Sequence, residues 1–296
     1  MTRRAAVLLV LLLGSVLGLQ AVHERRSGPP GGTAESLLYV RSPEAMKRMA
    51  LSYHSLLADV YWIRAVQHYG GTRLSTDPTK QYDLLYPLLD ITTSLDPHFR
   101  IAYLFGSVFL AEEPPGGPGR SDLAVALLQK GLRAQPDKWE YAQAIGFVHY
   151  WWDQDYMQAA AWFRRAAEMP NAPNWMAPLA AVTLAQGGNR ASSRRLWQEV
   201  LNNAEADWLR VQARFRLRQL DAMDQITALE ALIEEYARRV GTRPRTWADV
   251  VQAGFLPGVP LDPDRFPYQL DPASGAVTLD RKSTINPLPI ESSRRR

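Results

Sequence analysis

The sequence predicts an all-α protein, and three observations support this. Pro136 and Pro170 stand 34 residues apart and enclose two stretches in which small and apolar residues recur every three or four positions. Because proline stops a helix, each of the two marks the end of an element. The same helical spacing continues through most of the chain. A stack of helical hairpins is therefore expected for its central part.

The stretch between these prolines resembles a tetratricopeptide (TPR) repeat. Gly146 and Ala166 are small enough to let two helices approach closely, and Phe163 fills the space between them. The interval between the prolines also matches the period of that family. The resemblance covers residues 42–205 and implies about four helical hairpins. Such hairpins stack into a right-handed α-solenoid that binds other proteins and catalyses nothing itself.

Composition excludes several classes of protein. The 296 residues are 46% hydrophobic and 10% aromatic, which suffices for a folded core. The chain has no cysteine, so disulfide bonds, thiol catalysis and cysteine-ligated metals are excluded. The net charge of +4 is too small to indicate a nucleic-acid partner.

The N-terminus carries a membrane-targeting pattern. Arg3 and Arg4 precede an apolar run in residues 5–22, which as a helix would span about 27 Å, near the lower limit for crossing a bilayer core. An uncleaved anchor and a cleaved signal peptide both fit residues 1–22, and a buried helix is the remaining alternative. Residues 23–41 contain glycine and proline and are expected to form a linker. A basic N-terminus usually stays in the cytoplasm. The chain is therefore predicted to be membrane-anchored, with its soluble part on the periplasmic side.

A long helix is predicted from Ser42 to Tyr69. Ser42 is a suitable N-cap, the proline after it fits the first turn of a helix, and no breaker follows before Gly70. Apolar residues with three- and four-residue spacing predict a stripe that is buried in the core. These residues are Leu56, Val60, Ile63, Val66 and Tyr69.

Further helical units follow along the chain. Residues 82–95 predict a helix that ends before Pro97, and residues 113–119, which are rich in proline and glycine, interrupt the next unit. The last unit begins after Pro173 and turns at residues 187–189. With the stretch between Pro136 and Pro170, these units make up the expected hairpins.

Residues 206–240 are expected to cap the open end of the repeats. The stretch has helical spacing but lacks the small residues of the repeats. It predicts two capping helices joined near Asp221. Terminal repeats need such a cap because an exposed stacking face would be apolar.

Residues 241–290 predict a small C-terminal module. Thr246 can cap a short helix, and residues 268–279 read as a β-hairpin with a glycine at the turn. The segment Leu-Asp-Pro-Asp-x-x-Pro-Tyr in residues 261–268 resembles the stretch near the end of type II secretion pseudopilins. Residues 291–296 are expected to form a basic tail.

Motifs for catalysis are missing from the sequence. The five histidines lack the spacing of a metal site, and no phosphate-binding loop, dinucleotide fingerprint or serine elbow is present. His149 stands near Asp153 and Asp155, which we interpret as polar residues at a repeat turn. No catalytic residue, cofactor or metal is therefore predicted. The alternative is an envelope hydrolase whose acids converge inside the superhelix.

The resemblance to TPR proteins implies a partner-binding groove lined by the first helix of each hairpin. Transferred to this chain, it predicts an aromatic groove suited to an apolar or amphipathic segment of a partner protein. The alternative is that some of these aromatic residues pack inside the stack or under the C-terminal module. The groove residues are Gln143, Phe147, Tyr150, Trp151, Trp175 and Val182.

Arg210, Arg214 and Arg218 lie four residues apart and predict a basic stripe on one helix face. A solvated face is the usual meaning of such a stripe, and a contact with anionic lipid or an acidic partner is the alternative. Together, these features predict a non-catalytic, membrane-tethered scaffold. It resembles the TPR proteins that assist pilus assembly, secretion or cytochrome maturation in the bacterial envelope.

Overall fold

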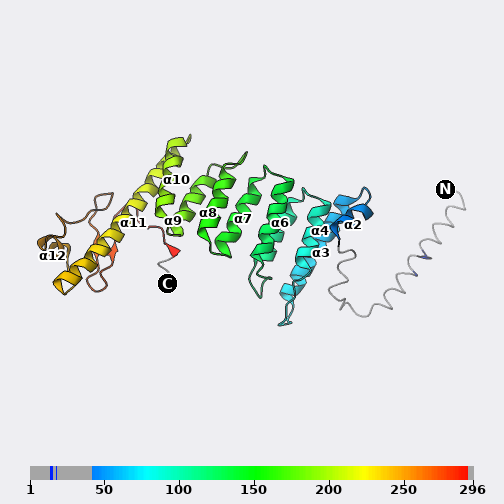
Figure 1. The fold of residues 1–296 in the computed structure, drawn as a ribbon, viewed down its shortest axis with the longest axis horizontal. Helices are drawn as coiled ribbons and strands as arrows, with labels where there is room; N and C mark the ends of the chain where they lie inside the picture. Colours follow the sequence, from blue (N-terminus) through cyan, green and yellow to red (C-terminus); the bar gives the residue numbers. More distant parts are fainter. Residues whose placement is uncertain (1–13, 16–17, 19–41, 293–296) are drawn as a thin grey trace. The chain divides into compact units, whose positions relative to one another are not determined.

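The computed structural model describes residues 14, 15, 18 and 42–292. The predicted anchor or signal and the linker therefore lie almost entirely outside the described residues, as does most of the basic tail. None of the helices in the described part is long and apolar enough to cross a membrane. Residues 42–292 contain eleven helices and one small antiparallel sheet, in agreement with an all-α fold (Figure 1). The chain divides into two compact units, residues 1–123 and 124–296.

The first unit begins with a short helix where the sequence predicted a long one. Helix α2 (Pro43–Met49) starts at Ser42, whose Oγ accepts a hydrogen bond from the backbone N–H of Ala45, as expected of an N-cap. The chain then turns, and α3 (His54–Leu74) begins only after Tyr53. The prediction of one helix up to Tyr69 was wrong, because Leu51 adopts a left-handed conformation with φ 50° and interrupts the helix.

The predicted buried stripe of α3 was also largely wrong. Helix α3 packs against α4 (Leu85–Leu95) through a different face. The buried residues of α3 are Ala58, Tyr61, Ala65 and Tyr69. Of the predicted stripe only Tyr69 is buried, whereas Leu56, Val60, Ile63 and Val66 are exposed. Alanines at the contact let the two helix backbones come close, which larger aliphatic residues would prevent.

Helix α5 (Arg100–Ala111) completes the packing of the first unit. Helix α4 packs against both α3 and α5 and supplies the leucines of the core. Aromatic rings join α3 to α5. The rings of Trp62 and Phe109 stack with centroids 6.1 Å apart, and those of Tyr69 and Phe109 stack at 4.2 Å.

The second unit consists of helices that pack against the next helix along the chain. Its helices α7 (Trp139–Trp151), α8 (Tyr156–Ala167), α9 (Met176–Gln186) and α10 (Arg190–Asn203) lie side by side in Figure 1 and contact one another in this order. Helix α6 (Ser121–Ala134) crosses the boundary between the two units. A Cβ atom on Gly146 of α7 would lie 2.4 Å from a ring carbon of Phe163 on α8. Only glycine allows this approach.

Helix α11 (Asp207–Val240) is one continuous helix of 34 residues, so the prediction of two helices joined near Asp221 was wrong. Asp221 does not break it, because its carboxylate faces outward and pairs with Arg194 of α10. The first half of α11 packs on the core of α9 and α10 through residues such as Leu209 and Ala213. The helix ends at Gly241, which has φ 87°.

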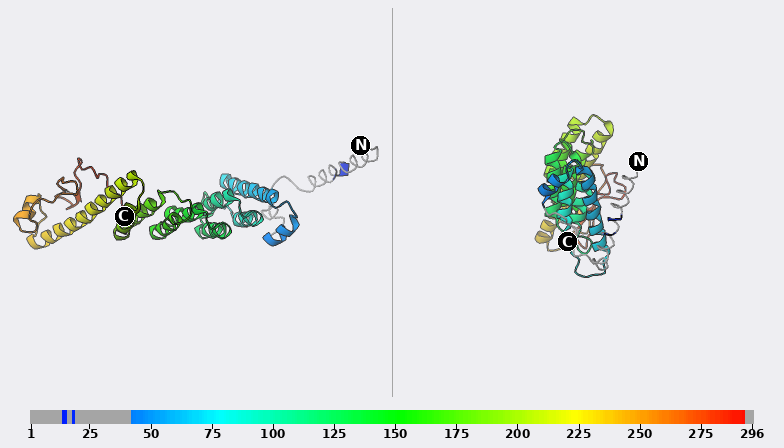
Figure 2. Two further views of the ribbon diagram at one scale, coloured as in Figure 1. Left: turned by 90° about the horizontal axis from the view of Figure 1, so that it is seen from above. Right: turned by 90° about the vertical axis from the view of Figure 1, so that its right-hand side faces the viewer.

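The second half of α11 carries the C-terminal module. Helix α12 (Trp247–Gln252) starts at a capping box between Thr246 and Asp249. Strand β1 (Gln269–Leu270) pairs antiparallel with β2 (Val277–Thr278), with Gln269 opposite Thr278. Strand β2 contacts α11, and the left view of Figure 2 shows the C-terminal segment beside this helix. The predicted short helix and hairpin are therefore present.

The module also fastens the end of the described chain. Trp247 donates a hydrogen bond from Nε1 to the carbonyl of Tyr268 at 2.7 Å. Gln219 of α11 donates to the carbonyls of Ile285 and Pro287. Glu291, which the sequence placed in a basic tail, is buried and pairs with Arg190 of α10. This pairing raises the pKa of Arg190 and fixes residue 291 on the helices.

Candidate binding surface

Large exposed apolar side chains are numerous on α3 and α5, and few lie on the other helices from α4 to α10. In the first unit α4 carries none among the described residues, and three more, Met49, Leu51 and Tyr53, lie at the end of α2 and in the turn before α3. In the second unit, Trp151 ends α7 and Trp175 precedes α9, whereas the second helices α8 and α10 expose only Met157. Others lie on α11, where Trp208 and Val211 are exposed, and in the C-terminal module. The set on α3 and α5 is large enough to indicate a contact surface.

The larger of these areas is in the first unit, and we call it the α3–α5 surface. It consists of Leu56, Val60, Ile63 and Val66 on α3 and of Ile101, Phe105 and Val108 on α5. The ring stack of Trp62 and Phe109 joins the two helices. Val66 follows Trp62 by one helical turn, and Phe105 precedes Phe109 by one turn. These two exposed residues therefore lie next to the Trp62–Phe109 ring stack.

The predicted groove residues of the second unit have mixed roles. Gln143, Phe147, Tyr150 and Val182 are half-buried. Phe147 packs edge-to-face on Phe163 at 5.1 Å, and the hydroxyl of Tyr150 donates to Oε1 of Gln186 on α9 at 2.6 Å. These two aromatic residues therefore hold the helices together, which matches the alternative that aromatic residues pack inside the stack.

The two predicted tryptophans are exposed but lie at different ends of the helices. Trp151 at the C-terminal end of α7 is 63% exposed, and its ring packs edge-to-face on Tyr150. Trp175 before α9 is 44% exposed and packs edge-to-face on Trp139 at the N-terminal end of α7. A helix of the length of α7 spans about 20 Å. The predicted residues thus form two separate aromatic pairs instead of one compact site.

The predicted basic stripe is partly neutralised. Arg210 pairs with Asp207 at 2.9 Å, and Arg218 pairs with Asp264 at 2.6 Å, while Arg214 is exposed on the same helix. Paired arginines offer less charge to an anionic partner. The arrangement favours the solvated face over a lipid or protein contact.

One contact relevant to catalysis is present. Nδ1 of His149 lies 2.8 Å from Oδ2 of Asp153, one turn further along the chain. Asp155 is not part of this pair, because its carboxylate caps α8 by accepting from the backbone N–H of Gln158. The pair is the histidine–acid contact that the hydrolase alternative requires, and it is also an ordinary contact between side chains four residues apart at a helix end. No group of three or more possible metal ligands occurs in the described residues.

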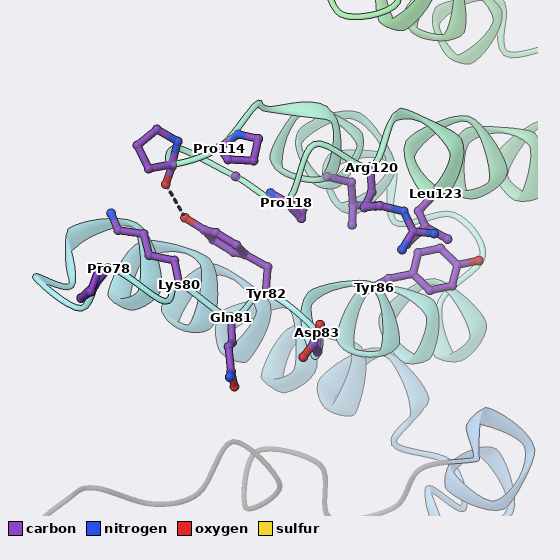
Figure 3. Close-up of a pocket in the computed structure, with 13 residues that line it drawn as sticks. Pro78, Lys80, Gln81, Tyr82, Asp83, Tyr86, Pro114, Pro118, Arg120 and Leu123 are labelled. Carbon is purple, nitrogen blue, oxygen red and sulfur yellow. Dashed lines mark hydrogen bonds between the residues drawn. The ribbon is translucent and has the colours of Figure 1, made fainter.

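The proline-rich loop in residues 113–119 forms one wall of a cavity of about 420 Å³ in the first unit. Figure 3 shows Tyr82 reaching across to this loop, where its hydroxyl donates to the carbonyls of Pro115 and Gly116 at 3.1 Å each. Burial raises the pKa of Tyr82, so the hydroxyl stays protonated as a donor. Arg120, also at the cavity, forms a bidentate pair with Asp122. The loop thus closes against the segment before α4.

The sequence pattern missed the α3–α5 surface and this cavity. The aliphatic spacing of α3 is the same for a buried and an exposed stripe, so it could not distinguish them. The proline-rich loop predicted an interruption, but its partner Tyr82 lies more than thirty residues earlier, beyond any local pattern. No protein-family model, curated protein or solved structure matches the chain.

Proposed function

We propose that this chain is a TPR-like scaffold without catalytic activity that binds an apolar or amphipathic segment of a partner protein during assembly of the cell envelope. In this proposal residues 5–22 tether it to the membrane, and the remainder works on the periplasmic side. The observation that carries the proposal is the exposed set of aliphatic and aromatic side chains on α3 and α5. In TPR proteins the first helix of each hairpin lines the binding face. The stretch between Pro136 and Pro170 resembles a TPR repeat.

The packing inside the second unit supports a TPR-like arrangement. Helices α7 to α10 each contact the next one along the chain, as stacked hairpins do. The close approach at Gly146 and Phe163 is the contact that the repeat pattern requires. Helix α11 covers α10 with apolar residues such as Leu209, which is the role of a terminal cap.

The α3–α5 surface fits the chemistry of an apolar partner helix. Its seven residues are aliphatic or aromatic, and on α3 they recur at three- and four-residue intervals. A partner helix with the same spacing can place its own apolar face along such a stripe. Burial of such side chains is favourable by about 1.5–3 kcal/mol each when complete, so a few contacts suffice for a transient complex.

Affinity capture of the full chain from detergent-solubilised membranes tests this function. The variant Ile63→Ser/Phe105→Ser should capture at most about one tenth of the partner that wild type captures, because central apolar contacts dominate the binding energy. The matched control Val259→Ser removes an exposed apolar residue of the C-terminal module and should retain the partner fully.

A second pair of variants locates the surface. If Trp151→Ala/Trp175→Ala abolishes capture and Ile63→Ser/Phe105→Ser does not, the aromatic pairs of the second unit bind the partner. Unchanged capture by both double variants would refute the scaffold proposal. Circular dichroism of each variant should match wild type, since all four substituted residues are exposed.

A further inference from the structure

The turn between α2 and α3 presents three large apolar side chains to solvent. Met49 is 65% exposed, Leu51 76% and Tyr53 67%. We call residues 49–53 the apolar turn. Such exposure of three neighbouring large side chains is unfavourable in water.

The apolar turn is held in place by its backbone and neighbours. Leu51 adopts φ 50°, a conformation that is uncommon for a leucine and costs free energy. The N–H of Tyr53 donates to the carbonyl of Ala50 at 2.8 Å, and the Ala50 side chain is buried. Nε2 of His54 contacts the carbonyl of Lys47 at 3.1 Å. The turn is thus tied to both helices while its apolar side chains point outward.

Positive charge lies directly beside the apolar turn. Lys47 and Arg48 occupy the last turn of α2, and both are exposed. The acidic residue of α2, Glu44, lies at the other end of the helix and contacts the hydroxyl of Ser42. An apolar tip beside cationic side chains is typical of segments that enter the interface of an anionic membrane.

The position in the chain brings the turn within reach of a membrane. Residues 5–22 are the predicted membrane segment, and residues 23–41 connect them to α2. Nineteen residues can span at most about 65 Å. The turn can therefore reach the surface of the bilayer that holds residues 5–22.

We propose that the apolar turn inserts into the anionic lipid surface of the membrane that holds the N-terminal segment. Leu51 and Tyr53 enter the boundary between headgroups and acyl chains, and Lys47 and Arg48 contact lipid phosphates. The soluble part then has a second membrane contact besides its tether. This contact limits the directions in which the α3–α5 surface can face, and it does not depend on the identity of any protein partner.

The lack of cysteine in the chain allows a direct test. The full chain carrying Leu51→Cys is placed in nanodiscs that contain phosphatidylglycerol, and its reaction with a charged, water-soluble maleimide is measured. The matched control is Leu74→Cys, which replaces a leucine that is 85% exposed at the far end of α3, about 30 Å away. We expect the thiol at 51 to react about tenfold more slowly than the one at 74, equivalent to insertion favoured by about 1.4 kcal/mol.

Charge variants separate lipid insertion from coverage by protein. Lys47→Gln or Arg48→Gln should each speed the reaction at 51 by about fivefold, equivalent to about 1 kcal/mol per cation. Nitroxide-labelled lipids should quench a fluorophore at 51 and leave one at 74 bright. Equal reactivity at the two positions would overturn the proposal. Slow reaction at 51 without lipid quenching would also overturn it, because another part of the chain or a partner would then cover the turn.

Discussion

Helices α3 and α7 show how similar sequence patterns lead to different surfaces. Both are first helices of hairpins, and both bury tyrosine and small residues, Tyr61 and Ala65 in α3 and Tyr141 and Gly146 in α7. In α7 the aliphatic residues lie in the core as well, whereas α3 exposes its aliphatic stripe. The small residues, and not the branched aliphatic ones, identify the packed face in both helices.

The physical reason is the distance between helix axes. Small residues at a contact allow the backbones to approach, and the packing of many atoms then outweighs the burial of a few larger side chains. In α3 the alanines and tyrosines fill the contact with α4, and the second apolar stripe remains exposed. An apolar stripe without a neighbour within its own unit is what a binding surface requires.

The largest expected difference in stability is between alanine variants of two isoleucines. Ile145 of α7 is fully buried and Ile63 of α3 is 53% exposed. Ile145→Ala should lower the free energy of unfolding by about 2–5 kcal/mol, and Ile63→Ala should change it by about 0.5 kcal/mol or less. Urea denaturation followed by circular dichroism measures both. If Ile63→Ala is as costly as Ile145→Ala, the stripe of α3 is buried in solution and the α3–α5 surface is not a binding site.

Two glycines give the next largest difference. A Cβ on Gly146 would collide with the ring of Phe163, whereas a Cβ on Gly71 of α3 meets nothing within 4 Å. Gly146→Ala should destabilise the protein by about 1–3 kcal/mol through overpacking. Gly71→Ala should stabilise it by about 0.5–1 kcal/mol, because alanine favours the helix. Equal effects in the same urea assay would mean that α7 and α8 do not pack closely at this point.

Local chemistry made part of the fold predictable. Ser42 and Thr246 cap helices as expected, and a glycine takes the turn of the C-terminal hairpin, because each of these residues acts through neighbours close in sequence. The break at Leu51 was not predictable, since neither glycine nor proline marks it. The continuity of α11 depends on contacts with α10 and with the C-terminal module. Such contacts between distant residues leave no local pattern.

The candidate site was only partly predictable for the same reason. Trp151 and Trp175 are exposed where the repeat pattern placed them, but Phe147 and Tyr150 serve the packing between helices. Which aromatic residue is free depends on how far its helix lies from the next. The pattern therefore identified two exposed tryptophans, and it could not distinguish them from the aromatic residues that pack between helices.

The smallest expected effect concerns pH and the buried side of α3. His68 is half-buried, and its Nε2 has no hydrogen-bond partner among the described residues. Burial lowers the pKa of His68, although the charge of Asp83 opposes this shift. The unfolded chain therefore takes up a proton first, near the ordinary histidine pKa of about 6.5. The contribution of His68 to stability is complete above this pH and falls as the pH drops toward the folded pKa.

Urea denaturation between about pH 8 and about pH 5 should show a smaller loss of stability in His68→Gln than in wild type. Parallel curves would show that water reaches this side of α3 and that burial there does not disfavour the charged form of His68.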